Sequence, residues 1–230
     1  SLTLNNVNFV HNSTDGIGGG LLFTGGNLIM NHVNLSLNEA GDGGGVYFSG
    51  NGAMDMNYVN FFNNTAVGLS EQGRAKGGGM YISSSAWDFP LNLTNVTLSG
   101  NQANGNDAGM GGGIYVFRAP GYAAIALTNV TFAGNRVNGT TALGGGICLD
   151  LMNISNSWRN MVLTNVTFSG NQANGSVVGS GGGIFFHPSG DLNMFNVTMS
   201  GNIATGETSQ GGGVFIGPSS NSFGFVRTFF

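Results

Sequence analysis

Apolar and polar residues alternate along this chain in one frame that returns seven times. A valine stands at the centre of each frame, with apolar residues five and three positions before it and two after it, and an asparagine five positions after it. The central valines are Val7, Val33, Val59, Val96, Val130, Val166 and Val197. Alternation with a period of two predicts short strands whose apolar side chains share one face.

The fourth frame serves as the example. Leu91 and Leu93 predict one short strand, and Val96 and Leu98 predict a second, with a corner between residues 93 and 96. Residues 114–116 predict a third strand, in which the central residue points away from its neighbours. Each repeat is therefore expected to contribute three short strands.

A glycine triplet follows every frame, at intervals of 25 to 37 residues. A period in this range predicts a solenoid, in which each unit buries its apolar face against the next. We expect an all-β, right-handed parallel β-helix of about seven coils with three short strands per coil, because parallel crossovers are overwhelmingly right-handed. Residues 1–230 form a single domain in this interpretation, possibly a segment of a longer solenoid.

The asparagine column is free of exceptions, and stacked amides can bond one another along a solenoid axis. We interpret it as a structural ladder, because a chemical site would occupy one or two coils rather than all of them. The glycine triplets are interpreted as tight corners that let neighbouring coils approach closely. The predicted ladder consists of Asn12, Asn38, Asn64, Asn101, Asn135, Asn171 and Asn202.

Four frames contain an F-x-x-N tetrapeptide, and each is followed by a triplet such as that of residues 111–114. This pairing resembles the F-x-x-N and G-G-[A/L/V]-[I/L/V] repeats of the chlamydial polymorphic outer-membrane proteins, and more loosely the pectin-lyase-like β-helix superfamily. The resemblance implies an extracellular, often adhesive passenger and names no catalytic residue. The tetrapeptides are residues 9–12, 61–64, 132–135 and 168–171.

Composition narrows the class further. The chain has 43 glycines and 31 asparagines but only 7% charged residues, which disfavours helical folds. A net charge of −4 offers no basic face for nucleic acid. No apolar run is long enough to insert into a bilayer. Cys148 is the only cysteine, so no internal disulfide can form.

Candidate catalytic groups are sparse. Polysaccharide-cleaving β-helices need clustered ionisable side chains, and here Asp and Glu number ten and Lys and Arg six. We predict no catalytic residue, no metal site and no cofactor, since the three histidines are scattered. A lyase or hydrolase that uses Asp88 or Arg159 stays open as an alternative.

An aromatic column follows the glycine triplets, at the position that alternation turns outward. We expect a continuous apolar stripe on the outer surface, to be covered by the chain's own loops, by another chain or by sugar. Leu22 and Cys148 occupy the same column. Its aromatic members are Tyr47, Tyr81, Tyr115, Phe185 and Phe215.

Three other features concern the surface. Trp87 and Trp158 stand in separate loops and are possible carbohydrate contacts, because exposed tryptophan stacks on sugars. The insertion of residues 65–76 is interpreted as a solvated tip. N-x-[S/T] sequons are in excess, and Asn12 is set aside because it belongs to the ladder. The remaining glycosylation candidates are Asn34, Asn63, Asn92, Asn95, Asn129, Asn138, Asn153, Asn165, Asn174 and Asn196.

These observations favour a non-enzymatic, extracellular or cell-surface β-helix. Residues 2–9 already form a standard coil and the chain closes on apolar residues, so both ends are expected to accept another copy head to tail. The expected product is a structural or adhesive fibril that carries N-linked glycans. A monomeric adhesin passenger is the first alternative.

Overall fold

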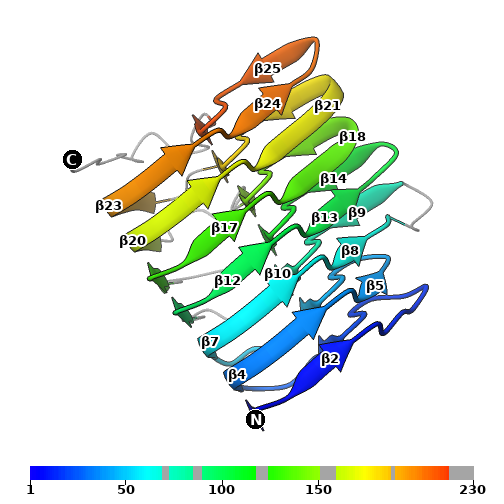
Figure 1. Cartoon of the computed structure of the whole chain (residues 1–230), viewed down its shortest axis with the longest axis vertical. Helices are drawn as coiled ribbons and strands as arrows, with labels where there is room; N and C mark the ends of the chain where they lie inside the picture. Colours follow the sequence, from blue (N-terminus) through cyan, green and yellow to red (C-terminus); the bar gives the residue numbers. More distant parts are fainter. Residues whose placement is uncertain (69–72, 85–89, 118–123, 151–158, 188–189, 218–230) are drawn as a thin grey trace.

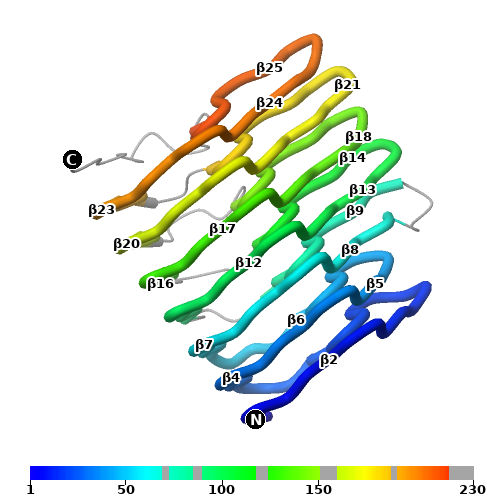
Figure 2. The backbone as a smooth tube through the Cα atoms, viewed as in Figure 1, coloured from blue at the N-terminus to red at the C-terminus, as the bar shows by residue number. Residues whose placement is uncertain are grey.

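The computed structural model is a parallel β-solenoid, which confirms the predicted fold class. It describes residues 1–68, 73–84, 90–117, 124–150, 159–187 and 190–217. The repeats lie one above another from the N-terminus to the last described strand (Figure 1), and the backbone trace shows each repeat as a flattened loop of similar shape (Figure 2). Within those ranges no helix could span a membrane.

Three sheets run along the axis, and each receives strands from every repeat that it crosses. The first sheet has ten strands. They are β1 (Leu2–Asn5), β2 (Asn8–Val10), β4 (Leu28–Ser36), β7 (Met54–Phe62), β11 (Leu91–Thr94), β12 (Thr97–Ser99), β16 (Ala124–Thr128), β17 (Thr131–Ala133), β20 (Arg159–Ser169) and β23 (Gly190–Ser200).

The second sheet has nine strands and the third sheet has seven. The second contains β5 (Glu39–Ala40), β8 (Thr65–Ala66), β9 (Arg74–Lys76), β13 (Gln102–Asn104), β14 (Ala108–Met110), β18 (Arg136–Leu143), β21 (Gln172–Ser180), β24 (Ile203–Thr205) and β25 (Thr208–Gln210). The third contains β3 (Leu21–Phe23), β6 (Val46–Phe48), β10 (Met80–Ser83), β15 (Ile114–Phe117), β19 (Ile147–Asp150), β22 (Ile184–His187) and β26 (Val214–Ile216).

The register between repeats is the one that the frame predicts. Leu91 pairs with Met54 on one side and with Ile125 on the other, in parallel strands. All three side chains are at most 2% exposed and belong to one apolar cluster that runs through the solenoid. Burying a large apolar side chain stabilises the fold by roughly 1.5–3 kcal/mol, so these columns supply the main core.

Three backbone corners in each repeat adopt the left-handed conformation. In the fourth repeat they are Asn95, Gly100 and Gly111, with φ of 54°, 66° and 64°. The first corner divides the first sheet into two flanks, the second precedes the ladder asparagine, and the third opens the glycine triplet. Asn and Gly tolerate this conformation better than other residues do, which is why they recur there.

The other two glycines of the triplet are required by close approach rather than by φ. A Cβ on Gly112 would lie 2.5 Å from the carbonyl oxygen of Gly145, and a Cβ on Gly113 would lie 2.5 Å from that of Gly146. Real Cβ atoms do not come this near to backbone. The triplet therefore lets consecutive repeats stack at strand spacing along their tightest turn.

The prediction of three strands per repeat was wrong in detail. In the fourth repeat, the two strands predicted around Val96 both belong to the first sheet, and residues 102–110 add β13 and β14 in the second sheet. Residues 65–76 were likewise interpreted as a solvated tip, yet β8 and β9 lie at its two ends. The second sheet was missed because its interior side chains are too small to give an apolar signal.

The second sheet forms a thin projection, which we call the fin. Figure 1 shows its strands running out from the body and back again. Its interior is a small separate cluster made almost wholly of alanine. A Cβ on Gly109 would come within 2.5 Å of the Cγ1 atom of Val137, so the two limbs are too close for larger side chains. The cluster contains Ala66, Ala75, Ala103, Val137, Ala142, Ala173 and Ala204.

Candidate interaction surface

The asparagine column forms the predicted ladder inside the solenoid. The backbone N–H and Nδ2 of Asn101 both donate to Oδ1 of Asn135, at 3.1 and 2.9 Å. Nδ2 also donates to the carbonyl oxygen of Phe61 at 3.0 Å. Oδ1 of Asn101 accepts from the backbone N–H and Nδ2 of Asn64. The same pattern links each ladder residue to the next, from Asn12 to Asn202.

Within the solenoid, between its two end members, the ladder leaves no polar capacity for a ligand. An asparagine side chain offers two donors and two lone pairs, and those of Asn101 are all used within the solenoid. Asn38, Asn64, Asn101, Asn135 and Asn171 are 0% exposed. The column therefore acts as a buried polar spine that satisfies backbone groups at the second corner.

A second row of asparagines lies outside, at the first corner. Asn95, Asn129, Asn165 and Asn196 have φ of 52–55°, and each Nδ2 after the first donates to the Oδ1 of the preceding one, at 2.7–3.1 Å. Left-handed φ favours asparagine, the next position is the core valine, and threonine follows on the outer face. Backbone and packing thus account for the asparagine and the valine of the four N-V-T sequons, whereas the outer threonine is not required, since the first three repeats have asparagine there.

The other sequon asparagines also lie on the outside of the solenoid. Asn34, Asn63 and Asn92 are exposed, and Asn138 and Asn174 are partly exposed on the fin. Nδ2 of Asn92 donates to Oδ1 of Asp55 at 2.7 Å. Asn153 lies outside the described residues. Glycosylation of any of these positions stays a prediction.

The aromatic column behind the glycine triplets lies outside the main core, under side chains of the second sheet. Its side chains do point away from the main core, but Tyr81, Tyr115 and Phe185 are only 2–8% exposed, and Cys148 is fully buried. Met110 and Leu143, at the base of the fin, pack with them in a cluster of their own. At its centre the column is therefore covered by residues of the chain itself, one of the three coverings considered from the sequence. Tyr47 and Phe215, toward the two ends, are partly exposed.

Burial governs the acid–base behaviour of this column. It raises the pKa of the Cys148 thiol well above its ordinary value, and the nearby Asp150 carboxylate adds to the shift. Burial likewise raises the pKa of Tyr81 and of Tyr115. The hydroxyl of Tyr115 donates to Oδ2 of Asp150 at 3.3 Å. A buried thiol with a raised pKa is a poor nucleophile, so the column offers packing rather than chemistry.

Charged side chains among the described residues form two ion pairs, Arg74 with Asp107 and Lys76 with Asp42, both at 3.4 Å. Burial raises the pKa of Asp42, and the charge of Lys76 opposes that shift. Within the described part of the chain, no group of three or more His, Cys, Asp and Glu could hold a metal ion.

Several candidate residues fall wholly or partly outside what the structure describes. Trp87, Asp88 and Trp158 lie outside the described residues, and only the backbone of Arg159 is described, at the start of β20. The possible carbohydrate contacts at the two tryptophans stay predictions.

Sequence reasoning missed one group of exposed rings on the first sheet. Tyr58 occupies the corner position where five of the seven repeats have asparagine, and it is 52% exposed with a φ of 53°. His32 holds the same corner one repeat earlier, and the two rings stack with centroids 5.0 Å apart. Phe62, four residues after Tyr58, is 51% exposed. The departure from asparagine at this corner was a signal available in the sequence.

Residues 165–187 match the Chlamydia polymorphic membrane protein (Chlamydia_PMP) repeat. The resemblance drawn from the F-x-x-N and glycine motifs is thereby confirmed over this stretch, which contains the first corner, the ladder asparagine and the triplet of one repeat. No curated protein and no solved structure matches the chain. A repeat of this kind within a parallel β-solenoid fits a surface β-helix of the adhesin type.

Proposed function

We propose that this protein is a non-enzymatic, extracellular β-helix rod of the adhesin type that displays its outer faces to other surfaces. The match of residues 165–187 to a membrane-protein repeat within a parallel solenoid is the observation that carries the proposal. The ladder supports it, because a spine of satisfied buried amides keeps the rod in one register while the outside varies.

End-to-end assembly is the second part of the proposal. The ladder is polar along the axis, with each asparagine donating toward the next repeat and accepting from the one before it. Among the described residues, nothing donates to Oδ1 of Asn12 and nothing accepts from the backbone N–H of Asn202. The two edges are complementary, and a second copy would continue the ladder across the junction. Heterologous contacts of this kind produce filaments.

The assembly is tested by electron microscopy and sedimentation velocity of the purified protein over a range of concentrations. We expect rods that lengthen with concentration, and shorter rods for Asn202→Leu, which removes the side-chain amide at one edge and leaves only the backbone N–H there. Thr131→Ser, on the first sheet and away from both edges, should behave like the wild type. Single particles of one size at high concentration would contradict stacking and favour the monomeric adhesin. Further repeats of the full protein that occupy these edges would do the same.

Glycan attachment is the third part of the proposal. Sequon asparagines follow the first corner and the flanks of the first sheet, where attached sugars would cover a surface with few charges and keep the rod soluble. Intact mass before and after enzymatic deglycosylation of the natively produced protein measures this directly. An unchanged mass would remove the glycan coat and leave the rod itself unaffected. We also expect no product release from pectin-type polysaccharides.

A further inference from the structure

The outer face of the first sheet changes character between the third and the fourth repeat. In the first three repeats, the middle of the second flank carries Asn8, Asn34 and Asn60, whereas the paired positions of the later repeats carry threonine. The exposed rings of His32, Tyr58 and Phe62 belong to the same three repeats. We call this face of β2, β4 and β7 the amide–aromatic patch.

Two rings of the patch, His32 and Tyr58, stand at a corner with left-handed φ and stack on each other on the outer surface. A left-handed φ costs a bulky residue roughly 1–2 kcal/mol, and the corners of the other five repeats avoid this cost with asparagine. Tyr58 is about half exposed, so it gains little from burial in return. Such uncompensated strain clusters at binding sites, where a side chain must be presented in a fixed direction.

The asparagines between the rings are already ordered. Nδ2 of Asn34 donates to Oδ1 of Asn8 at 2.8 Å, and Nδ2 of Asn60 donates to Oδ1 of Asn34 at 2.8 Å. An unglycosylated Asn34 therefore keeps one N–H and one lone pair for an outside partner, so the patch requires that this sequon be unmodified. The row presents paired donors and acceptors on a flat sheet, with little entropy left to lose on binding.

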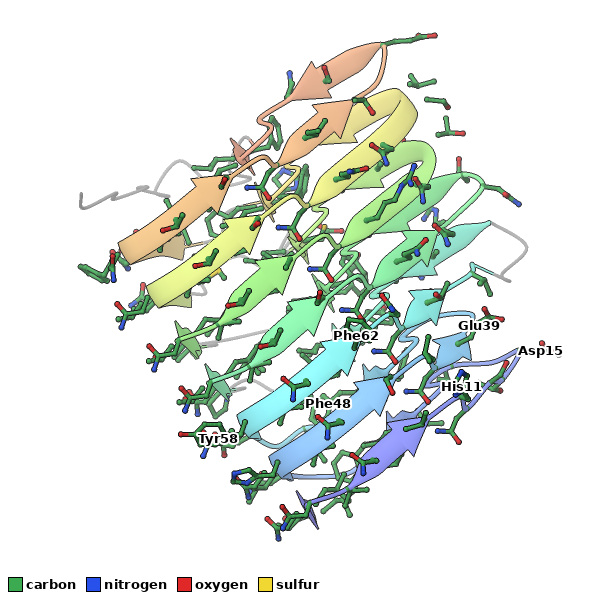
Figure 3. The ribbon with its side chains drawn as sticks, in the orientation of Figure 1. His11, Asp15, Glu39, Phe48, Tyr58 and Phe62 are labelled. Carbon is green, nitrogen blue, oxygen red and sulfur yellow. The ribbon has the colours of Figure 1, made fainter. Side chains whose placement is uncertain are left out.

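The rings bracket this row. Figure 3 places Tyr58 at the start of the visible flank of β7 and Phe62 at its arrowhead. Four residues of extended chain span roughly 13 Å, with the amides between the two rings. The outward side chains of this flank, at Asn8, Val10, Asn34, Ser36, Asn60 and Phe62, carry no charge. A neutral ligand with apolar faces and many hydroxyls matches this arrangement better than a nucleic acid or an ionic peptide does.

We propose that the amide–aromatic patch binds an uncharged pyranose oligosaccharide, with sugar rings stacked on Tyr58 and Phe62 and hydroxyls bonded to the asparagine row. The inference deepens the proposed adhesive function and rests on it for its biological setting. It differs from the tryptophan contacts expected from the sequence, because it uses β4 and β7.

The test is a printed array of neutral and acidic oligosaccharides, followed by calorimetric titration of the tightest neutral binder. Tyr58→Asn and Phe62→Ser replace each ring by a residue found at the same position of other repeats, so both should fold normally. Each is expected to weaken binding at least tenfold. Phe195→Thr, which restores the residue found one repeat earlier at the far end of the same sheet, is the matched control and should bind like the wild type.

Three results would overturn the inference: no binding by the wild type, binding to acidic glycans alone, or equal binding by Tyr58→Asn and wild type with unchanged melting temperatures. Binding of a second copy or of a protein ligand at the patch, with no glycan binding there, would also contradict the inference. Cell attachment separates the two proposals. If both variants still attach to cells, the adhesive function holds but does not use this site. If the wild type binds glycan but does not attach to cells, the site exists but has no adhesive role.

Discussion

The first three repeats and the last four share one interior and differ on the outside. Inside, the ladder asparagine and the apolar columns continue unchanged from repeat to repeat. On the first sheet's outer face, the early repeats carry the amide–aromatic patch, and the later ones carry threonine and corner asparagines. The difference teaches that stacking fixes what points inward, because every inward side chain contacts its own copies, whereas outward positions are free to diverge toward binding.

The largest effect is expected from substitutions in the ladder, and it tests whether the ladder contributes equally to stability in the early and the later repeats. Asn38→Ala and Asn135→Ala, one from each region, should each lower the free energy of unfolding by about 4 kcal/mol, because several buried donors and acceptors lose their partners at once. Chemical denaturation followed by circular dichroism measures both. A difference of more than about 2 kcal/mol between the two would show that the ladder is not equivalent along its length.

A smaller loss is expected where two repeats touch at the triplet. Gly113→Ala places a Cβ 2.5 Å from the carbonyl oxygen of Gly146, and we expect a cost of about 3 kcal/mol. Gly134→Ala is the control, because nothing lies within 4 Å of its Cβ and only its φ of 60° is unfavourable, so it should cost about 1 kcal/mol. Equal losses in thermal melts would indicate that the close approach at Gly113 costs no more than an unfavourable φ does.

The aromatic column differs from both asparagine rows in that its contribution to stability depends on pH. The Cys148 thiol and the Tyr115 hydroxyl have pKa values raised above the ordinary 9.0 and 10.0. The contribution of these two groups to the free energy of unfolding is fully present at pH values below those ordinary pKa values. As pH rises past them the unfolded chain loses protons that the folded chain retains, so the free energy of unfolding falls by about 1.4 kcal/mol per proton and pH unit.

Denaturation at pH 8, 10 and 11 gives this slope directly. Cys148→Ala and Tyr115→Phe should each flatten it, whereas Thr131→Ser should leave it unchanged. If the slope of both variants equals that of the wild type, these two groups do not set the alkaline limit.

The smallest effect is expected when the first-corner residues of the early and the later repeats are exchanged. Tyr58→Asn should leave stability unchanged or raise it by up to about 1 kcal/mol, since relief of the left-handed strain outweighs the lost ring stacking. The reverse change, Asn129→Tyr, should lower stability by about 1 kcal/mol. Paired thermal melts test both, and a stabilising Asn129→Tyr would remove the strain argument behind the patch.

Much of the fold could be read from particular residues. The apolar columns and the ladder were predictable because each depends on a side chain large or polar enough to mark its position, as Leu98 and Asn101 do. The fin was not predictable, because Ala103 and Gly109 mark a close approach only once the two limbs are seen together. The fate of Tyr115 was also hidden, since period-two alternation says which way a side chain points but not what lies over it.

The sequence by itself determined the repeat, the inward columns and the corners at the central valine and at the glycine triplet, because these depend on local periodicity and on recurring asparagine and glycine. Only the tertiary structure decided which outward rings are buried and which stay open. Tyr115 and Tyr58 are both outward tyrosines, yet one is 2% exposed and the other 52%. Exposure depends on distant segments such as the base of the fin, and no local pattern carries that information.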